Sequence, residues 1–382
     1  MYARSEFPEP DRILGCLLGG AIGDALGAPI ERATLTEIHA RHGEDGLTGY
    51  DGPAGGEGIV TGDTQLALLT AEALIQASVR ARTRGIGGAT GGLLQWNYLR
   101  WLESKDGRAA GPEPLEAGGL VPLRGSGLSA LPEMRARRGP GRSCVSALRK
   151  AAERGEPGHP LGTVETPIND SKGCGGVLRA APAGLAFSSH AAFGTGCEVA
   201  ALTHGHPSGY LPAGVLAATV WSLLRGADLP SALATARTAL ETHRGHDETS
   251  RALDAATALA EAGPPSPEGL ETLGRGRVGT QALAIAVCAA LPATEPGSVR
   301  PALLSAINHS GDSDATGALC GYLLGALHGT LGLPGHWQSG LDLRRVVIQI
   351  AADAALEFGP NPPTEPGWYG APMSWLLCYP EA

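Results

Sequence analysis

The apolar residues of this chain fall into blocks of roughly 12 to 20 residues, which is the length of helices rather than of strands. Glycine and proline separate the blocks, and no run of alternating β-branched residues with Asn-Gly turns indicates a hairpin. Residues 66–75 are apolar on nearly every side, as in a helix buried on all faces. The pattern predicts helices over Ile13–Leu26, Thr64–Ala81, Leu211–Leu224, Gln281–Leu291, Thr316–Leu331 and Leu343–Leu356.

Many small residues in these blocks would let the helices approach one another closely. We therefore expect an all-α fold, a compact orthogonal multi-helix bundle, in a single domain that covers residues 1–382. The segment 104–141 is rich in Gly, Pro and Arg, and we expect a long surface loop with at most one helical turn there. No repeat of fixed period is present.

Charge and hydropathy exclude several classes of protein. No stretch approaches the ~20 consecutive apolar residues of a membrane span, so we expect no membrane partner. Residues 1–11 carry charges and two prolines without an apolar core, which does not match a signal peptide. The net charge is −9, and basic residues form only short clusters, so nucleic acid is not expected as the main partner.

The seven cysteines stand singly, without a CxxC pair, and their number is odd. Most lie in apolar helical blocks. This distribution favours free thiols in a reducing, cytoplasmic setting over a disulfide framework or a zinc site.

Two acidic motifs each open a buried helix. The first contains Thr61, Asp63 and Thr64, and the second contains Asp312 and Asp314. Either motif alone is explained by helix capping, because Asp and Thr are ordinary residues at a helix start. If the two starts converge, however, their carboxylates repel one another and need a cation. Oxygen ligands favour Mg²⁺, Mn²⁺ or Ca²⁺ over zinc, so the pair predicts a hydrolase-type divalent-metal pocket.

Three further motifs could add substrate contacts. Residues 169–179 form a glycine-rich segment whose backbone N–H groups could bind phosphate, although glycines also simply make tight turns. His204 and His206 could be ligands, or part of a loop that ends a helix. A Gly/Ala-rich helix leads to Asp24 and then Glu31, which we expect at the same end of the bundle.

The order and spacing of these five motifs resemble the ADP-ribosylglycohydrolase family, from about residue 12 to residue 356. The combination is specific, whereas no single motif is. The resemblance implies an all-α fold with a two-metal centre, usually of Mg²⁺ or Mn²⁺. It also implies cleavage of the glycosidic bond at C1″ of ADP-ribose.

Residue by residue, the resemblance implies metal-ligand roles for Thr61, Asp63, Asp312 and Asp314. It implies catalytic roles for Glu31 and Asp63. The residues that it places near the substrate are Asp24, Asn169, Asp170, Gly173, Cys174, Gly175, Gly176, His204, Ser310 and Gly311.

The chain departs from the family pattern at two ligand positions. Gly62 stands where the family's Thr-Asp-Asp-Thr motif has its middle Asp, and Ala315 stands where a Ser or Thr supplies a hydroxyl. Relatives also often carry Trp and Glu where this chain has Arg277 and Gln281. Mg²⁺ sites depend on carboxylates and tolerate water ligands, so the missing Asp should matter more. We expect one tight metal and one weak or absent one.

Three functions follow from these observations. The first is a metal-dependent hydrolase that acts on an ADP-ribosyl or related N-ribosyl protein or small molecule. The second is a catalytically weak or inactive relative that binds ADP-ribose or a nucleotide, and the third is a purely structural relative. Metal content and turnover of ADP-ribosyl-arginine distinguish them.

Overall fold

Helices are the only regular elements in the described part of this chain. A computed structural model describes residues 5–51, 56–85, 87–105, 127–139, 141–154, 160–363 and 375–379. Within these ranges no strand forms, and the only β-type pairs are the isolated bridges Gly58–Leu341 and Gly173–Val278. The predicted all-α fold is confirmed.

Seventeen labelled α-helices follow one another in the described ranges, with 3₁₀ segments between several of them. They are α1 (Pro10–Gly27), α2 (Leu35–His42), α3 (Gly62–Arg84), α4 (Thr90–Lys105), α5 (Pro132–Arg135), α6 (Arg142–Arg154), α7 (Ser189–Ala201), α8 (Pro207–Leu223), α9 (Leu229–Leu240), α10 (Asp247–Glu261), α11 (Pro267–Glu271), α12 (Gly279–Ala290), α13 (Val299–Ile307), α14 (Ser313–His328), α15 (Gly335–Gly340), α16 (Arg344–Glu357) and α17 (Trp375–Cys378).

The six predicted helices correspond to α1, α3, α8, α12, α14 and α16. The expected helix over Thr316–Leu331 ends earlier, at His328, because Gly329 takes a left-handed φ of 68° that breaks the helix. The more polar helices, such as α9 and α10, were not predicted. Their apolar residues occupy only one side, so they do not stand out as apolar blocks.

Helices α1 and α14 run antiparallel with their backbones in direct contact. A Cβ atom on Gly23 would lie 1.9 Å from the carbonyl oxygen of Gly317, and one on Gly321 would lie 1.9 Å from that of Gly19. Only glycine fits at such a distance. The glycines of this contact, which we call the glycine seam, are Gly15, Gly19, Gly23, Gly27, Gly317, Gly321 and Gly325.

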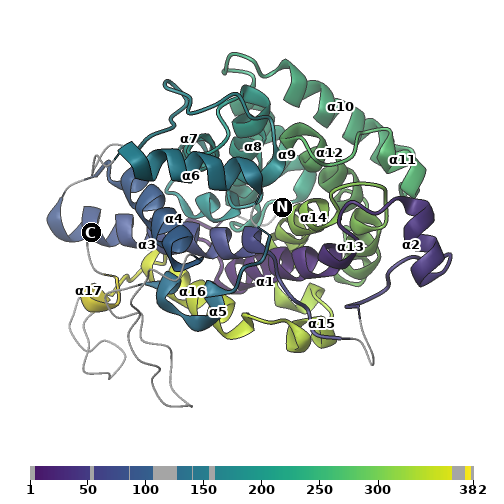
Figure 1. The fold of residues 1–382 in the computed structure, drawn as a ribbon, viewed down its shortest axis with the longest axis horizontal. Helices are drawn as coiled ribbons and strands as arrows, with labels where there is room; N and C mark the ends of the chain where they lie inside the picture. Colours follow the sequence, from purple (N-terminus) through teal and green to yellow (C-terminus); the bar gives the residue numbers. More distant parts are fainter. Residues whose placement is uncertain are drawn as a thin grey trace.

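The glycine seam buries the apolar helix α1 inside the protein. The segment Pro10–Ile30 is long and apolar enough to cross a membrane by length and composition, which the sequence analysis did not anticipate. In the structure, 83% of its most apolar window is buried inside the protein. Figure 1 shows α1 in the middle of the view, with α8, α9 and α12 above it and α15 below.

The expected surface loop over residues 104–141 falls mostly outside the described residues, so the structure does not test it. Residues 106–126 lie outside the described part. After them, a 3₁₀ turn (Leu128–Ala130) and α5 follow, and the side chains of Leu128 and Met134 are buried in the core. Burial of these two apolar side chains packs this part of the Gly- and Arg-rich stretch against the core.

Candidate metal centre

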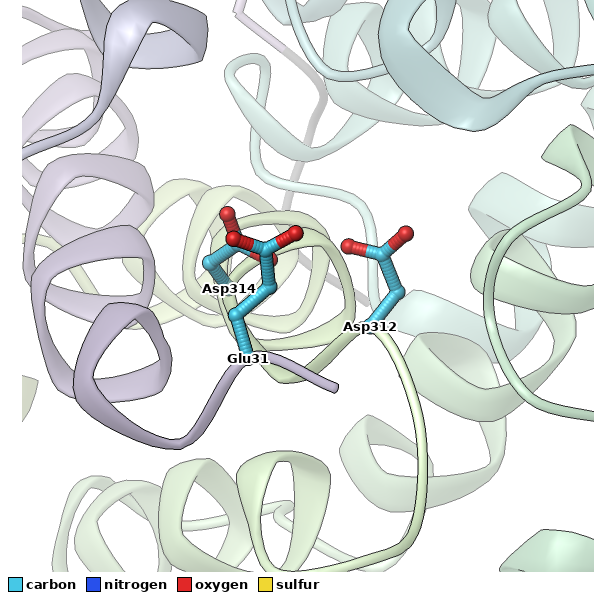
Figure 2. A group of neighbouring side chains, drawn as sticks. All are labelled: Glu31, Asp312 and Asp314. Carbon is cyan, nitrogen blue, oxygen red and sulfur yellow. The ribbon is translucent and has the colours of Figure 1, made fainter. Parts of the chain in front are cut away.

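Three carboxylates converge at the end of the glycine seam. Glu31 follows the 3₁₀ turn Ala28–Ile30 that extends α1, Asp312 precedes α14, and Asp314 lies in its first turn. Each offers an oxygen atom, and these atoms all lie within 4.8 Å of one another. Figure 2 shows the three side chains grouped around one space. The contact of Gly27 with Ser313 and Asp314 brings the two helix ends together.

Asp24 joins this end of α1 to the start of α3. Its Oδ2 atom accepts hydrogen bonds from the Thr61 N–H, at 2.8 Å, and from the Thr64 hydroxyl. Thr61 in turn caps α3, because its hydroxyl accepts the N–H of Asp63 at 3.1 Å. The Oδ1 atoms of Asp24 and Asp63 are buried and have no partner among the residues described.

Burial and mutual repulsion disfavour the charged forms of these acids. Burial, followed by the charges of Asp24 and Asp312, raises the pKa of Asp63 well above its usual range. Burial and the neighbouring Asp312 do the same for the pKa of Asp314. Burial raises the pKa of Asp24 to about 6. Such a cluster is stabilised by a cation.

Arg179, at the end of the glycine-rich segment, provides a positive charge near this cluster. Its side chain is fully buried and donates to the Val199 carbonyl at 2.9 Å and to the Thr203 hydroxyl at 2.5 Å. It lies over the ring of Tyr98, with 4.8 Å from Cζ to the ring centroid. Its charge partly offsets the raised pKa of Asp63.

Glu31 is held by the turn that follows it. The Nε atom of Arg32 lies 2.7 Å from Glu31 Oε1, and the Arg32 N–H donates to the Gly311 carbonyl at 2.7 Å. Arg32 has a φ of 67°, an uncommon conformation for a residue with a side chain. Ser310, expected near the substrate, accepts the Leu35 N–H at 2.8 Å. Ser310 and Gly311 thus position the Glu31 turn, and no sequence signal marked Arg32.

The glycine-rich segment lies beside the acidic cluster. The Sγ atom of Cys174 is 3.7 Å from Asp312 Oδ2, and its N–H donates to the Arg277 carbonyl at 3.2 Å. Asn169 shapes the segment from the other end, because its Oδ1 accepts the N–H groups of Ser171 and Gly205. Asp170 is exposed.

His204 packs directly against these glycines. A Cβ on Gly173 would lie 3.2 Å from His204 Nε2, one on Gly175 would lie 3.4 Å from Cε1, and one on Gly176 would lie 3.1 Å from Nδ1. The Thr203 hydroxyl lies 2.8 Å from Nδ1. Burial, followed by the charge of Arg179, lowers the pKa of His204 to about 3, so its ring is neutral. Glycine at these positions leaves room for the imidazole of His204. The sequence pattern did not suggest this role for the glycines.

The positions that depart from the family pattern have roles within the fold. The Gly62 N–H donates to the Arg138 carbonyl at 2.7 Å, and the Arg138 side chain forms an ion pair with Asp342. Ala315 is fully buried. Gln281 Oε1 accepts the Arg275 N–H at 3.2 Å. Arg275 also offers its carbonyl to the N–H of Asp312 at 2.9 Å, so Gln281 supports the turn beside the acidic motif.

The fold and the site define a class: all-helical proteins with an acidic cluster at the paired ends of two central helices. Residues 6–363 match the ADP-ribosylglycohydrolase family, and the chain belongs to that family. It is similar to the ADP-ribosyl-[dinitrogen reductase] glycohydrolase of Rhodospirillum rubrum, with 25% identity over 358 residues, 91% of this chain and 98% of the relative. A solved structure described as an ADP-ribosylglycohydrolase-related protein complex is 26% identical. It matches with a TM-score of 0.54 over 90% of this chain and 96% of the other.

Proposed function

We propose that this protein is a cation-dependent hydrolase that cleaves the glycosidic bond at C1″ of an ADP-ribosyl or related N-ribosyl group. One observation above all supports the proposal. The carboxylates of Glu31, Asp312 and Asp314 converge within 4.8 Å. The glycine-rich segment passes directly beside them, at Cys174. A cation and a phosphate-bearing substrate could therefore meet at one place.

The donor atoms fit a hard divalent cation such as Mg²⁺ or Mn²⁺. Asp312 and Asp314 would hold it, with Asp63 and Thr61 beside them. The Oδ1 atom of Asp63, which has no partner among the described residues, would then gain the cation as its partner. Burial and the nearby carboxylates raise the pKa of Cys174 well above its usual range, so its thiol stays protonated and is a poor ligand. When bound, the ion supplies positive charge and Lewis acidity to the reacting oxygen atoms.

The chain's own residues account for binding and proton transfer. Glu31 is the general acid or base, because its side chain is 32% exposed and can reach a water or a leaving group. Arg32 holds that carboxylate in place. His204 is neutral, so it offers a hydrogen bond to a ribose hydroxyl rather than a charge. The diphosphate would be bound by the backbone N–H groups of Gly175 and Gly176, because those of Gly173 and Cys174 already donate to the Ser171 hydroxyl and the Arg277 carbonyl.

The test is release of ADP-ribose from ADP-ribosyl-arginine in the presence of Mg²⁺. We expect Asp312→Asn to lower kcat/KM by about two orders of magnitude, as for loss of a charged group from a transition-state site. Glu241→Gln removes an exposed carboxylate from the end of α9 and serves as the matched control. A wild-type chain that hydrolyses neither ADP-ribosyl-arginine nor an N-ribosyl pyridinium, or an Asp312→Asn variant as active as the wild type, contradicts the proposal.

Gly62 and Ala315 favour a second candidate, a binder of ADP-ribose with weak or no turnover. The two positions lack a carboxylate and a hydroxyl that the family pattern supplies. Calorimetry with ADP-ribose distinguishes the two. Tight binding that Gly175→Val weakens, together with no hydrolysis of either ADP-ribosyl-arginine or an N-ribosyl pyridinium, identifies a binder. Hydrolysis of the pyridinium alone identifies an enzyme for activated bonds.

A further inference from the structure

A cavity of about 490 Å³ lies away from the metal centre, between the end of α2, the loop that follows it, and α15. Its walls include His42, Gly46, Gly49, Tyr50, Asp51 and Trp337. No residue assigned to the acidic cluster or to the glycine-rich segment lines it. The volume is within the range of small-molecule sites, about 300–1,000 Å³.

The indole of Trp337 carries the argument. The side chain is 1% exposed, and its Nε1 atom has no hydrogen-bond partner in the described ranges. The residue is well anchored, because the Tyr50 hydroxyl donates to its carbonyl at 2.9 Å. An unpaired buried N–H destabilises the folded state, and in native proteins such a group normally has a partner, including water or a ligand.

The N–H faces the space that Gly49 leaves open. A Cβ on Gly49 would lie 3.6 Å from Trp337 Nε1, with no other atom within 4 Å of it. Gly49 has no left-handed φ, so its backbone does not require glycine. The missing side chain therefore leaves open space beside the indole nitrogen, which is itself buried.

A second nitrogen atom in the same wall has an unused hydrogen-bonding capacity. His42 Nε2 is buried and lacks a partner among the residues that the structure describes. Arg300 adds a positive charge nearby. Its guanidinium lies over the Trp337 ring, 5.7 Å from the centroid, and donates to the Thr48 carbonyl at 3.0 Å. Asp51, an acidic residue of the wall, is exposed, where solvent and salt screen its charge.

Trp337 can only donate a hydrogen bond, and His42 can donate from Nε2, so the group that fits between them is an acceptor with more than one oxygen. We propose that this cavity binds the oxyanion group of a small molecule, a carboxylate or a phosphate, through Trp337 Nε1 and His42 Nε2.

The experiment follows the six indole N–H resonances of the ¹⁵N-labelled full-length chain. Trp337→Phe identifies the Trp337 signal by its loss. Sodium acetate and inorganic phosphate are titrated separately at constant ionic strength, with EDTA present so that no divalent cation recruits anions to the acidic cluster. We expect a saturable shift of the Trp337 signal with at least one anion, and the anion that acts identifies the carboxylate or the phosphate.

Gly49→Ala supplies the variant, because its methyl group fits without strain and occupies the space in front of Nε1. It should weaken binding about tenfold or more, equivalent to roughly 1.4 kcal/mol. Gly87→Ala is the matched control, since a Cβ there has no atom within 4 Å. The proposal is overturned if neither anion shifts the Trp337 signal, or if Gly49→Ala binds the anion as tightly as the wild type. Neither result depends on hydrolase activity.

Discussion

At the scale of single residues, the proposed cation binding is supported by buried carboxylate oxygen atoms that have no hydrogen-bond partner in the described part of the chain. The Oδ1 atoms of Asp24 and Asp63 are of this kind. Residue type and position alone predicted both acids. Their hydrogen bonds could not be predicted, because Asp24 engages Thr61 and Thr64 through a contact between separate helices.

Asp314→Asn should change how the protein responds to Mg²⁺. In EDTA, removing one charge from the cluster lowers the repulsion, so the Tm should equal or exceed that of the wild type. A ligand that binds only the native state stabilises it by about 2.7 kcal/mol at one hundred times its Kd. Wild-type Tm should therefore rise by several degrees in saturating Mg²⁺, and the variant's should not. Scanning calorimetry measures both, with Glu241→Gln as control. An equal rise in variant and wild type would exclude Asp314 as a ligand.

Gly62→Asp should increase the number of bound metal ions. The new carboxylate would add negative charge beside Asp63, and the N–H that bonds to Arg138 would remain. We expect stoichiometry to rise from about one ion towards two, with Ala315→Ser in addition contributing less, since water replaces a hydroxyl ligand readily. Equilibrium dialysis with metal analysis measures this. If the wild type already binds two ions, other residues have replaced the missing ligands.

Glu72, on α3, should make stability depend on pH independently of the metal centre. Burial raises its pKa to about 7, although it accepts the Leu128 N–H at 2.7 Å. A raised folded pKa contributes stability that is complete below the unfolded value of 4.5 and is lost as pH rises through about 7. Glu72→Gln mimics the protonated form.

The variant should exceed the wild type by less than about 1 kcal/mol near pH 5 and by up to about 3 kcal/mol at pH 8, at 1.36 kcal/mol per pKa unit. Urea unfolding at both pH values measures the difference. The same difference at pH 5 and pH 8 would show that this carboxyl does not titrate between them.

The glycine seam is the feature that matters most at the scale of elements. Spacings of four residues between glycines are visible in the sequence of both α1 and α14. The pairing of these two helices, and the register that sets Gly23 against Gly317, could not be predicted from either helix alone. Local patterns predict that a helix is buried. Which helix packs against it depends on the packing of all the helices in the fold.

Gly23→Ala should destabilise the fold. The new Cβ would lie 1.9 Å from the Gly317 carbonyl oxygen, so two backbones must separate, at a cost of about 1–3 kcal/mol or more. The matched control is Gly194→Ala in α7, where a Cβ has no atom within 4 Å. It should stabilise by about 0.5–1 kcal/mol, because alanine favours helix. The free energy of unfolding in urea measures both, and equal effects of the two variants would contradict a tight seam.

At the scale of the whole molecule, the candidate centre is formed by segments that are far apart in the sequence. Glu31, Asp63, the glycine-rich segment and Asp314 come from four parts of the chain. Acidic residue types at helix starts predicted that Asp63, Asp312 and Asp314 belong to one candidate centre. The sequence did not indicate Arg32 or Arg179 as neighbours of the centre, because neither arginine belongs to a repeating pattern of polar and apolar residues that would mark its position.

The pairing of α1 with α14 also has a consequence for the synthesis of the chain. After α1 is synthesised, every element from α2 to α13 must be made before its partner α14 follows. At 5–20 residues per second that interval is on the order of tens of seconds. During this time the apolar helix α1 lacks the helix against which its glycine seam packs. The newborn chain is therefore a natural client for a chaperone that binds apolar helices, and a chain truncated before α14 should aggregate rather than fold.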